Sequence, residues 1–284
     1  MTDEVDALDV LVVGGGPAGA AAAVFTARAG LDTRVYNRGP SALSQCAHLS
    51  NYLGFPEGID VETFDELTDA HVRAAGGTVH EAHVETVHHD DSADAGNFRA
   101  ETDTGEMVHA DRVVAATRQT ATYLDAFEEL FADGSFDADA VDADGRTPVE
   151  GLYVAGPRGG GPDQALVAAG HGARVGHAIA VAAREDRGYW PDIASEYYDW
   201  TPRESAFEPG WEESVADWIR GTVPDGADVT SDTVDDVVAE TVDHERESAL
   251  SVEEIDERRR EAQHALLDHL DDDVIREYLD STED

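Results

Sequence analysis

An α/β fold with a mainly parallel sheet, followed by an α-helical C-terminal region, is the fold class that this sequence predicts. A short apolar run at 10–13 leads directly into a glycine-rich turn and an alanine-rich segment that ends near residue 29. A second apolar run at 152–155 is also followed by glycines and by a small-residue segment, 164–183. Beyond about residue 185 the composition changes, and all four tryptophans fall there. A strand, a glycine turn and a helix in this order are typical of a Rossmann-like fold.

The first elements form a βαβ unit of the expected size. We expect a buried strand over Asp9–Val13, a helix over Pro17–Ala29 that ends at Gly30, and a parallel strand over Thr33–Asn37. A loop over 50–59 then leads into a helix over 61–75. Three alternating segments separated by turn residues predict an antiparallel three-stranded meander: Thr78–His88, Asn97–Thr102 and Met107–Ala115.

The second half is expected to return to the sheet and then to become helical. Residues 118–150, 33 in number, are acidic and weakly patterned. A buried strand over Leu152–Ala155 and a helix over Gln164–Ala183 follow, and Ser251 with Glu254 forms a capping box before a further helix. We therefore predict two domains, a Rossmann-like domain over 1–184 and a helical extension over 185–284.

The charge of the chain is extreme. It has 62 acidic and 19 basic residues, a formal net charge of -43, and every basic residue is arginine. Such self-repulsion becomes tolerable in concentrated salt, where the Debye length falls to roughly 3 Å at about 1 M. We therefore expect a salt-adapted cytoplasmic protein that binds neither nucleic acid nor an anionic membrane. The absence of lysine excludes an internal Schiff base and a phosphate loop with its lysine.

Cys46 is the only cysteine, so an intramolecular disulfide, a Cys-x-x-Cys redox pair and a cysteine zinc cluster are all excluded. The acidic N-terminus has no apolar signal segment, and no apolar run approaches the roughly 20 residues of a membrane span. These features favour a cytoplasmic location.

The pattern Gly14-x-Gly16-x-x-Gly19 predicts a dinucleotide site. The first glycine permits the tight turn, the second lets the backbone approach a pyrophosphate, and the third lets the helix pack close to the strand. The helix N-terminus favours the anion. The acidic residue that usually grips the adenosine ribose is replaced by Asn37, which can still hydrogen-bond a hydroxyl. Arg38 follows and could meet a 2′-phosphate, so NADP stays open as the alternative to FAD.

These motifs together resemble the flavin domain of thioredoxin reductases and their single-domain haloarchaeal relatives. The resemblance rests on the glycine-rich opening, on 51–59, on Ala115-Ala-Thr117 and on Gly151 through Gly172, and it covers about residues 8–183. It implies FAD as the cofactor. With the residues of the dinucleotide motif, the candidate cofactor-binding residues are Gly14, Gly16, Pro17, Ala18, Gly19, Asn37, Arg38, Gln45, Asn51, Val84, Ala116, Thr117, Gly156, Gln164 and Ala165.

Several of these residues have particular roles in the resemblance. The backbone of Val84 would bind adenine, Asn51 and Thr117 would line the flavin channel, and Gln164 with Ala165 would meet the pyrimidine edge of the isoalloxazine. A helix N-terminus at that edge favours the negative charge of reduced flavin.

The sequence departs from the family in three places. Pro157 follows Gly156 where the family has a carboxylate, and Arg118 follows Thr117 where the family has glycine. Residues 118–150 are too few for the family's nicotinamide domain, which needs roughly 100 residues. That domain would also carry the dithiol.

Other candidate residues have a functional and a structural interpretation. Cys46, beside His48, could react with a flavin, although a small buried hydrophobe is the more common role of a lone cysteine. His171 could donate a proton, although a helix-surface position is the better expectation. The run from His88 to Asp91 offers metal-ligand types, but adjacent strand residues face opposite sides, so we expect an exposed turn and no metal.

The predicted function is that of an FAD-dependent oxidoreductase without its own nicotinamide domain or redox dithiol. NAD(P)H would act as a diffusible reductant, or a small-molecule or protein partner would exchange the electrons. No catalytic residue can be named. A non-catalytic FAD-binding module and, less favoured, an NADP-binding dehydrogenase are the alternatives. The C-terminal aromatic residues would pack against the main domain or within a homodimer, with a lid over the flavin as the other interpretation.

Overall fold

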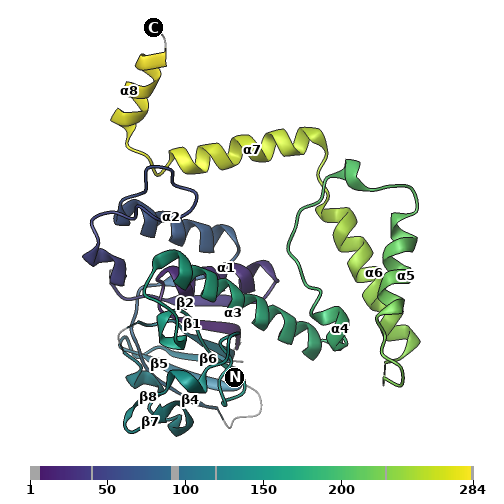
Figure 1. Cartoon of the computed structure of the whole chain (residues 1–284), viewed down its shortest axis with the longest axis horizontal. Coiled ribbons are helices and arrows are strands. Elements are labelled where there is room, and N and C mark those ends of the chain that lie inside the picture. The colour runs from purple at the N-terminus through teal and green to yellow at the C-terminus, as the bar shows by residue number, and fades with distance from the viewer. Residues whose placement is uncertain (1–6, 40, 91–95, 119, 228, 283–284) are drawn as a thin grey trace, which may run out of the picture. The chain divides into compact units, whose positions relative to one another are not determined.

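The structure is a computed structural model that describes residues 7–39, 41–90, 96–118, 120–227 and 229–282. The chain divides into two compact units, Met1–Ala180 and Val181–Asp284 (Figure 1). Helix α3, Ala165–Asp186, runs across this division. The domain boundary at 184/185 that composition suggests stays a prediction.

The first unit contains a seven-stranded sheet in the order β3-β2-β1-β6-β5-β4, with β9 paired to β6. The pairs β2–β1, β1–β6 and β6–β9 are parallel, which gives the expected α/β core. The strands are β1 Leu8–Val13, β2 Thr33–Tyr36, β3 Thr78–His80, β4 Val84–His89, β5 Phe98–Thr102, β6 Met107–Ala115 and β9 Leu152–Val154.

The expected meander is present as β4, β5 and β6, but its first segment was predicted too long. Residues 78–88 form two strands, because β3 pairs in parallel with β2 while β4 pairs antiparallel with β5. The chain turns between them at Ala82, whose N–H donates to the His80 carbonyl. Asp103 then holds the start of β4, since its carboxylate accepts from the His83 N–H at 3.0 Å.

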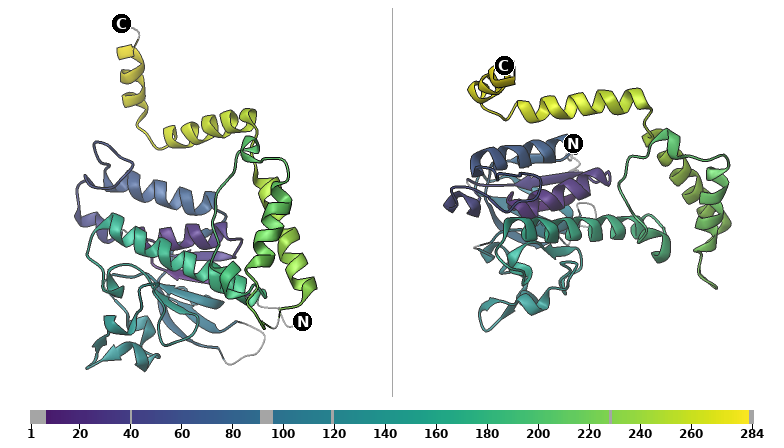
Figure 2. Two further views of the ribbon diagram at one scale, coloured as in Figure 1. Left: turned by 45° about the vertical axis from the view of Figure 1, so that its right-hand side comes forward. Right: turned by 45° about the horizontal axis from the view of Figure 1, so that its top comes forward.

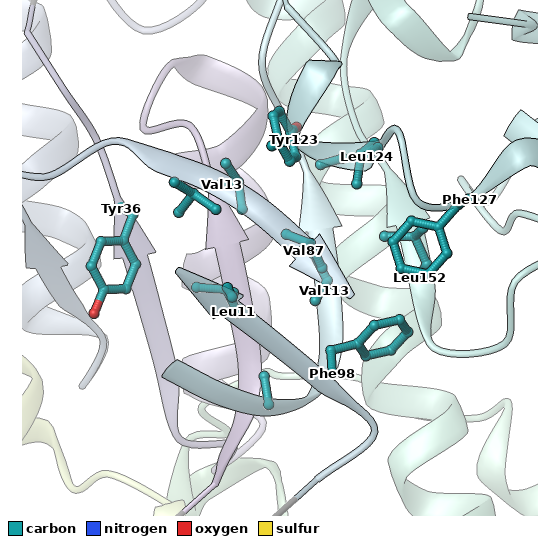
Figure 3. Close-up of a cluster of buried hydrophobic side chains, with 14 of the residues drawn as sticks. Leu11, Val13, Tyr36, Val87, Phe98, Val113, Tyr123, Leu124, Phe127 and Leu152 are labelled. Carbon is teal, nitrogen blue, oxygen red and sulfur yellow. The ribbon is translucent and has the colours of Figure 1, made fainter. Parts of the chain in front are cut away.

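Strand β1 is buried on both faces, which explains its uninterrupted apolar sequence. Val10 and Val12 on one face and Leu11 on the other are 0% exposed. Figure 3 shows Leu11 and Val13 in the core cluster together with Tyr123, Leu124 and Phe127. The last three residues come from the acidic segment 118–150, so this weakly patterned stretch supplies part of the core.

The segment between β6 and β9 contains only short elements in its described residues. These are the 3-10 turns η2 Thr122–Leu124, η3 Glu128–Leu130 and η4 Ala138–Ala140, and a hairpin of β7 Phe131–Ala132 and β8 Ser135–Phe136. They form no βαβ unit of the kind a nicotinamide domain requires.

Helices α1, Pro17–Arg28, and α2, Val61–Ala74, lie beside each other against the sheet, and α3 lies along α1 (Figure 2). Small residues allow α3 and α1 to approach closely. A Cβ added at Gly172 would lie 1.9 Å from the Ala18 carbonyl oxygen, and one at Gly176 would lie 2.7 Å from the Ala22 carbonyl oxygen. Gly172, the last glycine of the second motif, and Gly176 beyond it therefore serve the packing of α3 against α1. Shorter turns of this unit are η1 Ala42–Gln45 and η5 Pro157–Gly159.

The second unit is helical, as predicted. After the end of α3 it contains α4 Pro191–Ala194, η6 Glu204–Ala206, α5 Trp211–Gly221, α6 Ser231–Ser248, α7 Val252–Leu267 and α8 Asp272–Thr282. Its core gathers Trp190, Ile193 and Ile219 with valines of α5 and α6, and the Trp190 indole donates to the Thr222 hydroxyl at 2.9 Å. The capping box of Ser251 and Glu254 is confirmed.

Among the helices of the described residues, none combines the length and the apolar character that crossing a membrane requires.

Candidate functional site

The turn between β1 and α1 has room only for glycine at two of its motif positions. Gly14 has φ +108°, and a Cβ there would lie 2.9 Å from the Ala116 carbonyl oxygen. A Cβ at Gly19 would lie 1.8 Å from the Gly14 carbonyl oxygen. The first and third glycines therefore bring strand, turn and helix together in the way the motif predicts.

The N-terminus of α1 is open to an anion. No side chain caps it at Gly16, Pro17 occupies the first turn, and the first turn has no acidic residue. A Cβ at Gly16 would meet nothing within 4 Å. The first turn thus has no side-chain cap and no negative charge, and a helix N-terminus of this kind fits a pyrophosphate.

The second glycine-rich segment reaches the first. Gly156 follows β9 with φ +85°, and a Cβ there would lie 2.9 Å from the Ala18 Cβ. The Gly156 N–H donates to Nδ1 of His171 at 3.1 Å. His171 lies on α3 and is partly exposed, as expected, and a Cβ added at Gly159 would lie 2.7 Å from its imidazole.

Thr117 lies at the end of β6, beside the Gly14 turn. Its hydroxyl donates to the Thr120 carbonyl, so the Tyr123 hydroxyl, 2.9 Å away, donates to Thr117. Full burial raises the pKa of Tyr123 to about 12, because desolvation penalises the phenolate. Arg158 donates to the Thr117 carbonyl at 3.1 Å, and its guanidinium lies 5.2 Å from the centre of the Phe136 ring.

Asn51 and Gln164 meet although 113 residues separate them. The Asn51 amide donates to the Gln164 side-chain oxygen at 3.0 Å. Ala165, the first residue of α3, packs against a small apolar cluster that includes Leu49 and Phe64. The loop at 50–59 is therefore attached to the N-terminus of α3.

An ion pair joins this region to the end of β6. Nε and Nη2 of Arg118 donate to the two carboxylate oxygens of Asp163 at 3.0 and 2.8 Å. The hydrogen bonds to Asp163 raise the pKa of Arg118. The negative charge of Asp163 and the electrostatic effect of Cys46 raise it further. The same hydrogen bonds lower the pKa of Asp163.

Asn37 and Arg38, which follow β2, have different neighbours. A Cβ at Gly15 would lie 2.8 Å from the side chain of Asn37, which places Asn37 beside the glycine turn. Arg38 instead forms an ion pair with Asp103 at 2.8 Å. A 2′-phosphate would have to compete with that carboxylate for Arg38.

Two of the sequence-predicted residues are not brought into these contacts. Gln45 is exposed at the end of η1. Val84 is 1% exposed and belongs to the core cluster that contains Val13 and Tyr36. The structure gives neither residue a contact that marks a ligand site.

Cys46 is exposed, so its interpretation as a buried hydrophobe was wrong. It follows η1 in a loop whose neighbouring residues are also exposed, and the local sequence gives it no apolar enclosure. The His48 imidazole is hydrogen-bonded to Ser50 at 3.2 Å.

The histidine run at the end of β4 lies in a strand and not in the expected turn. His89 stacks on Phe98, with 5.4 Å between ring centres, and Asp90 pairs with His109 at 2.6 Å. Asp91 lies outside the described residues. Within the described ranges, no group of three or more His, Cys, Asp or Glu side chains could hold a metal ion.

Three residues of this site have no signal in the sequence. Tyr123 lies in the weakly patterned segment, Arg158 follows the unusual Pro157, and Asp163 directly precedes Gln164. Only the position of Asp163 beside a predicted site residue could have suggested it. Arg158 and Asp163 find their partners about 40 residues away, at Thr117 and Arg118, whereas Tyr123 meets Thr117 six residues earlier.

Comparisons with known proteins bear on the fold and on the first glycine-rich segment. Residues 9–53 match a family model described as an FAD binding domain. No curated protein matches the chain.

Solved structures with the same fold include three thioredoxin reductases. The atypical enzyme of Desulfovibrio vulgaris Hildenborough is 19% identical, with a TM-score of 0.53 over 64% of this chain and 100% of that chain. The enzyme from Gloeobacter violaceus is also 19% identical, with a TM-score of 0.52 over 65% and 98%. The T. acidophilum enzyme is 17% identical, with a TM-score of 0.51 over 62% of this chain and 99% of that chain. The chain is thus similar in fold to the thioredoxin reductases, with a Rossmann-like FAD-binding fold, and its residues 9–53 carry the sequence pattern of an FAD binding domain.

Proposed function

We propose that the first unit binds FAD and that the protein is an FAD-dependent oxidoreductase without a nicotinamide domain of its own. The observation that carries this proposal is the N-terminus of α1, which no side chain caps at Gly16 and which has no acidic residue in its first turn. Bound FAD would supply hydride and electron transfer. The protein would supply its binding and orientation.

The residues already described divide the work of holding the cofactor. Gly14, Gly16 and Gly19 would accommodate the pyrophosphate, and Asn37 beside Gly15 would reach the adenosine ribose. Thr117 and the Asn51–Gln164 pair would line the isoalloxazine channel. The Tyr123 hydroxyl keeps its proton at neutral pH and fixes the orientation of Thr117.

Electrons would come from free NAD(P)H or from a partner protein, and a dithiol route is not proposed because Cys46 has no second cysteine to pair with. A cytoplasmic location, adaptation to salt and a homodimer remain predictions from the sequence.

The test is a visible absorption spectrum of protein purified in molar salt, followed by anaerobic addition of NADH or NADPH. We expect yellow protein that is bleached by at least one of these donors. Bound flavin that resists every donor would favour a non-catalytic FAD module. Colourless protein that binds NADPH tightly would favour the dehydrogenase alternative, in which Arg38 leaves Asp103 for a 2′-phosphate.

A matched pair of variants tests the pyrophosphate position. Gly16→Ala adds a Cβ where no protein atom lies within 4 Å, so the fold is expected to tolerate it while FAD binding weakens by about tenfold or more. Gly221→Ala in α5 also meets nothing within 4 Å and should leave FAD binding unchanged. Equal FAD affinity of the two variants would contradict the proposed position of the pyrophosphate.

A further inference from the structure

The Arg118–Asp163 ion pair stands out among the ion pairs of the described residues. Several others join residues three or four apart on one helix, as Arg276 does with Asp272 and Asp273. Arg118 and Asp163 are 45 residues apart and form two parallel hydrogen bonds. Bidentate geometry of this kind fixes both side chains more firmly than a single contact.

The residues on both sides of the ion pair are connected to the proposed flavin site. On one side, the Arg118 carbonyl accepts a hydrogen bond from Arg158 at 3.0 Å, and Arg158 also holds the Thr117 carbonyl. On the other side, Asp163 directly precedes Gln164, which accepts a hydrogen bond from Asn51. The pair therefore links the strand end at Thr117 to the N-terminus of α3.

The charges of the pair have opposite consequences for a group at that helix N-terminus. The partial positive charge of the 22-residue helix α3 favours an anion there. The Asp163 carboxylate opposes this effect, and the Arg118 guanidinium offsets the carboxylate. Arg118, which stands where the family has glycine, therefore forms a neutral pair with Asp163. This pair lies near the N-terminus of α3, where reduced flavin would carry its negative charge.

We propose that Arg118 and Asp163 are positioning residues that set the reduction potential of the bound flavin. Arg118 neutralises Asp163 and orients the segment that carries Gln164. This inference rests on the proposed function, because it requires FAD at the site. It predicts that removing the two charges shifts the potential in opposite directions.

The experiment measures the midpoint potential of bound FAD by equilibration with redox dyes, together with the dissociation constant for FAD. Asp163→Asn removes the negative charge and should favour reduction about tenfold, which is about 30 mV upward for a two-electron couple. Arg118→Gln leaves Asp163 unpaired and should shift the potential downward by a similar amount. Arg118→Lys keeps the charge and should restore most of the wild-type value.

Arg174→Gln is the matched control. Arg174 pairs with Asp144 at 2.7 Å and lies on α3, about 14 Å from the first residue of that helix at 1.5 Å per residue. The midpoint potential of FAD bound to the Arg174→Gln variant should equal that of the wild type. Molar salt should shrink the two shifts, because both side chains are partly exposed, 43% for Arg118 and 55% for Asp163.

The inference would be overturned if Asp163→Asn and Arg118→Gln shifted the potential in the same direction, or if neither variant shifted it. Bound flavin in the wild-type protein would still support the proposed cofactor. Wild-type protein that binds no FAD would overturn the proposed function itself, and the inference with it. The two failures are told apart by the colour of the wild-type protein.

Discussion

The segment between β6 and β9 and the last two helices differ in a way that their sequences conceal. Residues 118–150 are acidic, and those that the structure describes form short turns and one small hairpin, yet Leu124 and Leu130 are 0% exposed and Phe127 is 2% exposed. Helices α7 and α8 have regular apolar spacing, and α7 has a complete capping box, yet none of their described residues is buried. Regular local structure and contribution to a core are therefore separate properties.

The difference has a physical origin. A capping box and helical spacing act within a few residues, so they produce a helix wherever the chain lies. Burial requires a complementary surface, and the irregular segment finds one on the sheet face formed by Leu11 and Val113 (Figure 3). Substitutions at Phe127 and at two helix caps test this contrast, and a substitution at Gly172 tests a close contact between helices.

The largest effect is expected from Phe127→Ala. Loss of this buried ring should lower the free energy of unfolding of the first unit by about 3–5 kcal/mol, through lost burial and a residual cavity. Amide hydrogen exchange of β1 and β6 would measure it. Leu266→Ala in α7 removes a side chain that is 54% exposed and should cost less than about 0.5 kcal/mol. Equal costs would show that α7 has a partner surface.

A second test concerns the close approach of α3 to α1. Gly172→Ala places a Cβ 1.9 Å from the Ala18 carbonyl oxygen, so the helices must separate, at a cost of about 3 kcal/mol. Gly170→Ala makes the same change two residues away, where nothing lies within 4 Å, and should be neutral or stabilising by up to about 1 kcal/mol. Urea unfolding followed by circular dichroism measures both variants. Similar midpoints would mean that the helices do not need this contact.

The smallest change in stability is expected when the N-caps of two helices are removed and compared. Asp60 caps α2 by accepting from the Thr63 N–H at 2.9 Å, and Ser251 caps α7 in the same way through the Glu254 N–H. Asp60→Ala should destabilise the first unit by about 1 kcal/mol. Ser251→Ala should reduce the helix content of α7 and leave the unfolding of the first unit unchanged, because α7 buries nothing.

The Asp60 cap also has a defined pH dependence. The hydrogen bond from the Thr63 backbone lowers the pKa of Asp60 below its usual value. Its contribution is therefore fully present above the unfolded pKa, about 3.9, and is lost as the pH falls through the lower folded pKa. The stability difference between wild type and Asp60→Ala should disappear in that acidic range. A difference that persisted at still lower pH would exclude the carboxylate as its source.

The tryptophans provide a separate probe for these experiments. Trp190, Trp200, Trp211 and Trp218 all lie in the second unit. Fluorescence therefore reports that unit, while exchange of β1 and β6 reports the first. Phe127→Ala and Gly172→Ala should leave the tryptophan environment unchanged in the native state.

The sequence by itself determined the order of the elements, the glycine turn after β1, the small-residue helix α3 and the capping box of α7. Each depends on interactions among residues that are close along the chain, such as the positive φ at Gly14 or the reciprocal hydrogen bonds of Ser251 and Glu254. Apolar runs buried on both faces were also readable, because their composition alone excludes an exposed strand.

The tertiary structure alone decided how residues 78–88 divide between two pairings and that Leu124 and Phe127 enter the core. It left Cys46 exposed and brought His171 into a hydrogen bond with Gly156. It also decided that Arg118 meets Asp163 and that Asn51 meets Gln164. These outcomes depend on partners that lie from tens of residues to more than a hundred residues apart, and no local pattern specifies which distant surface a segment will meet.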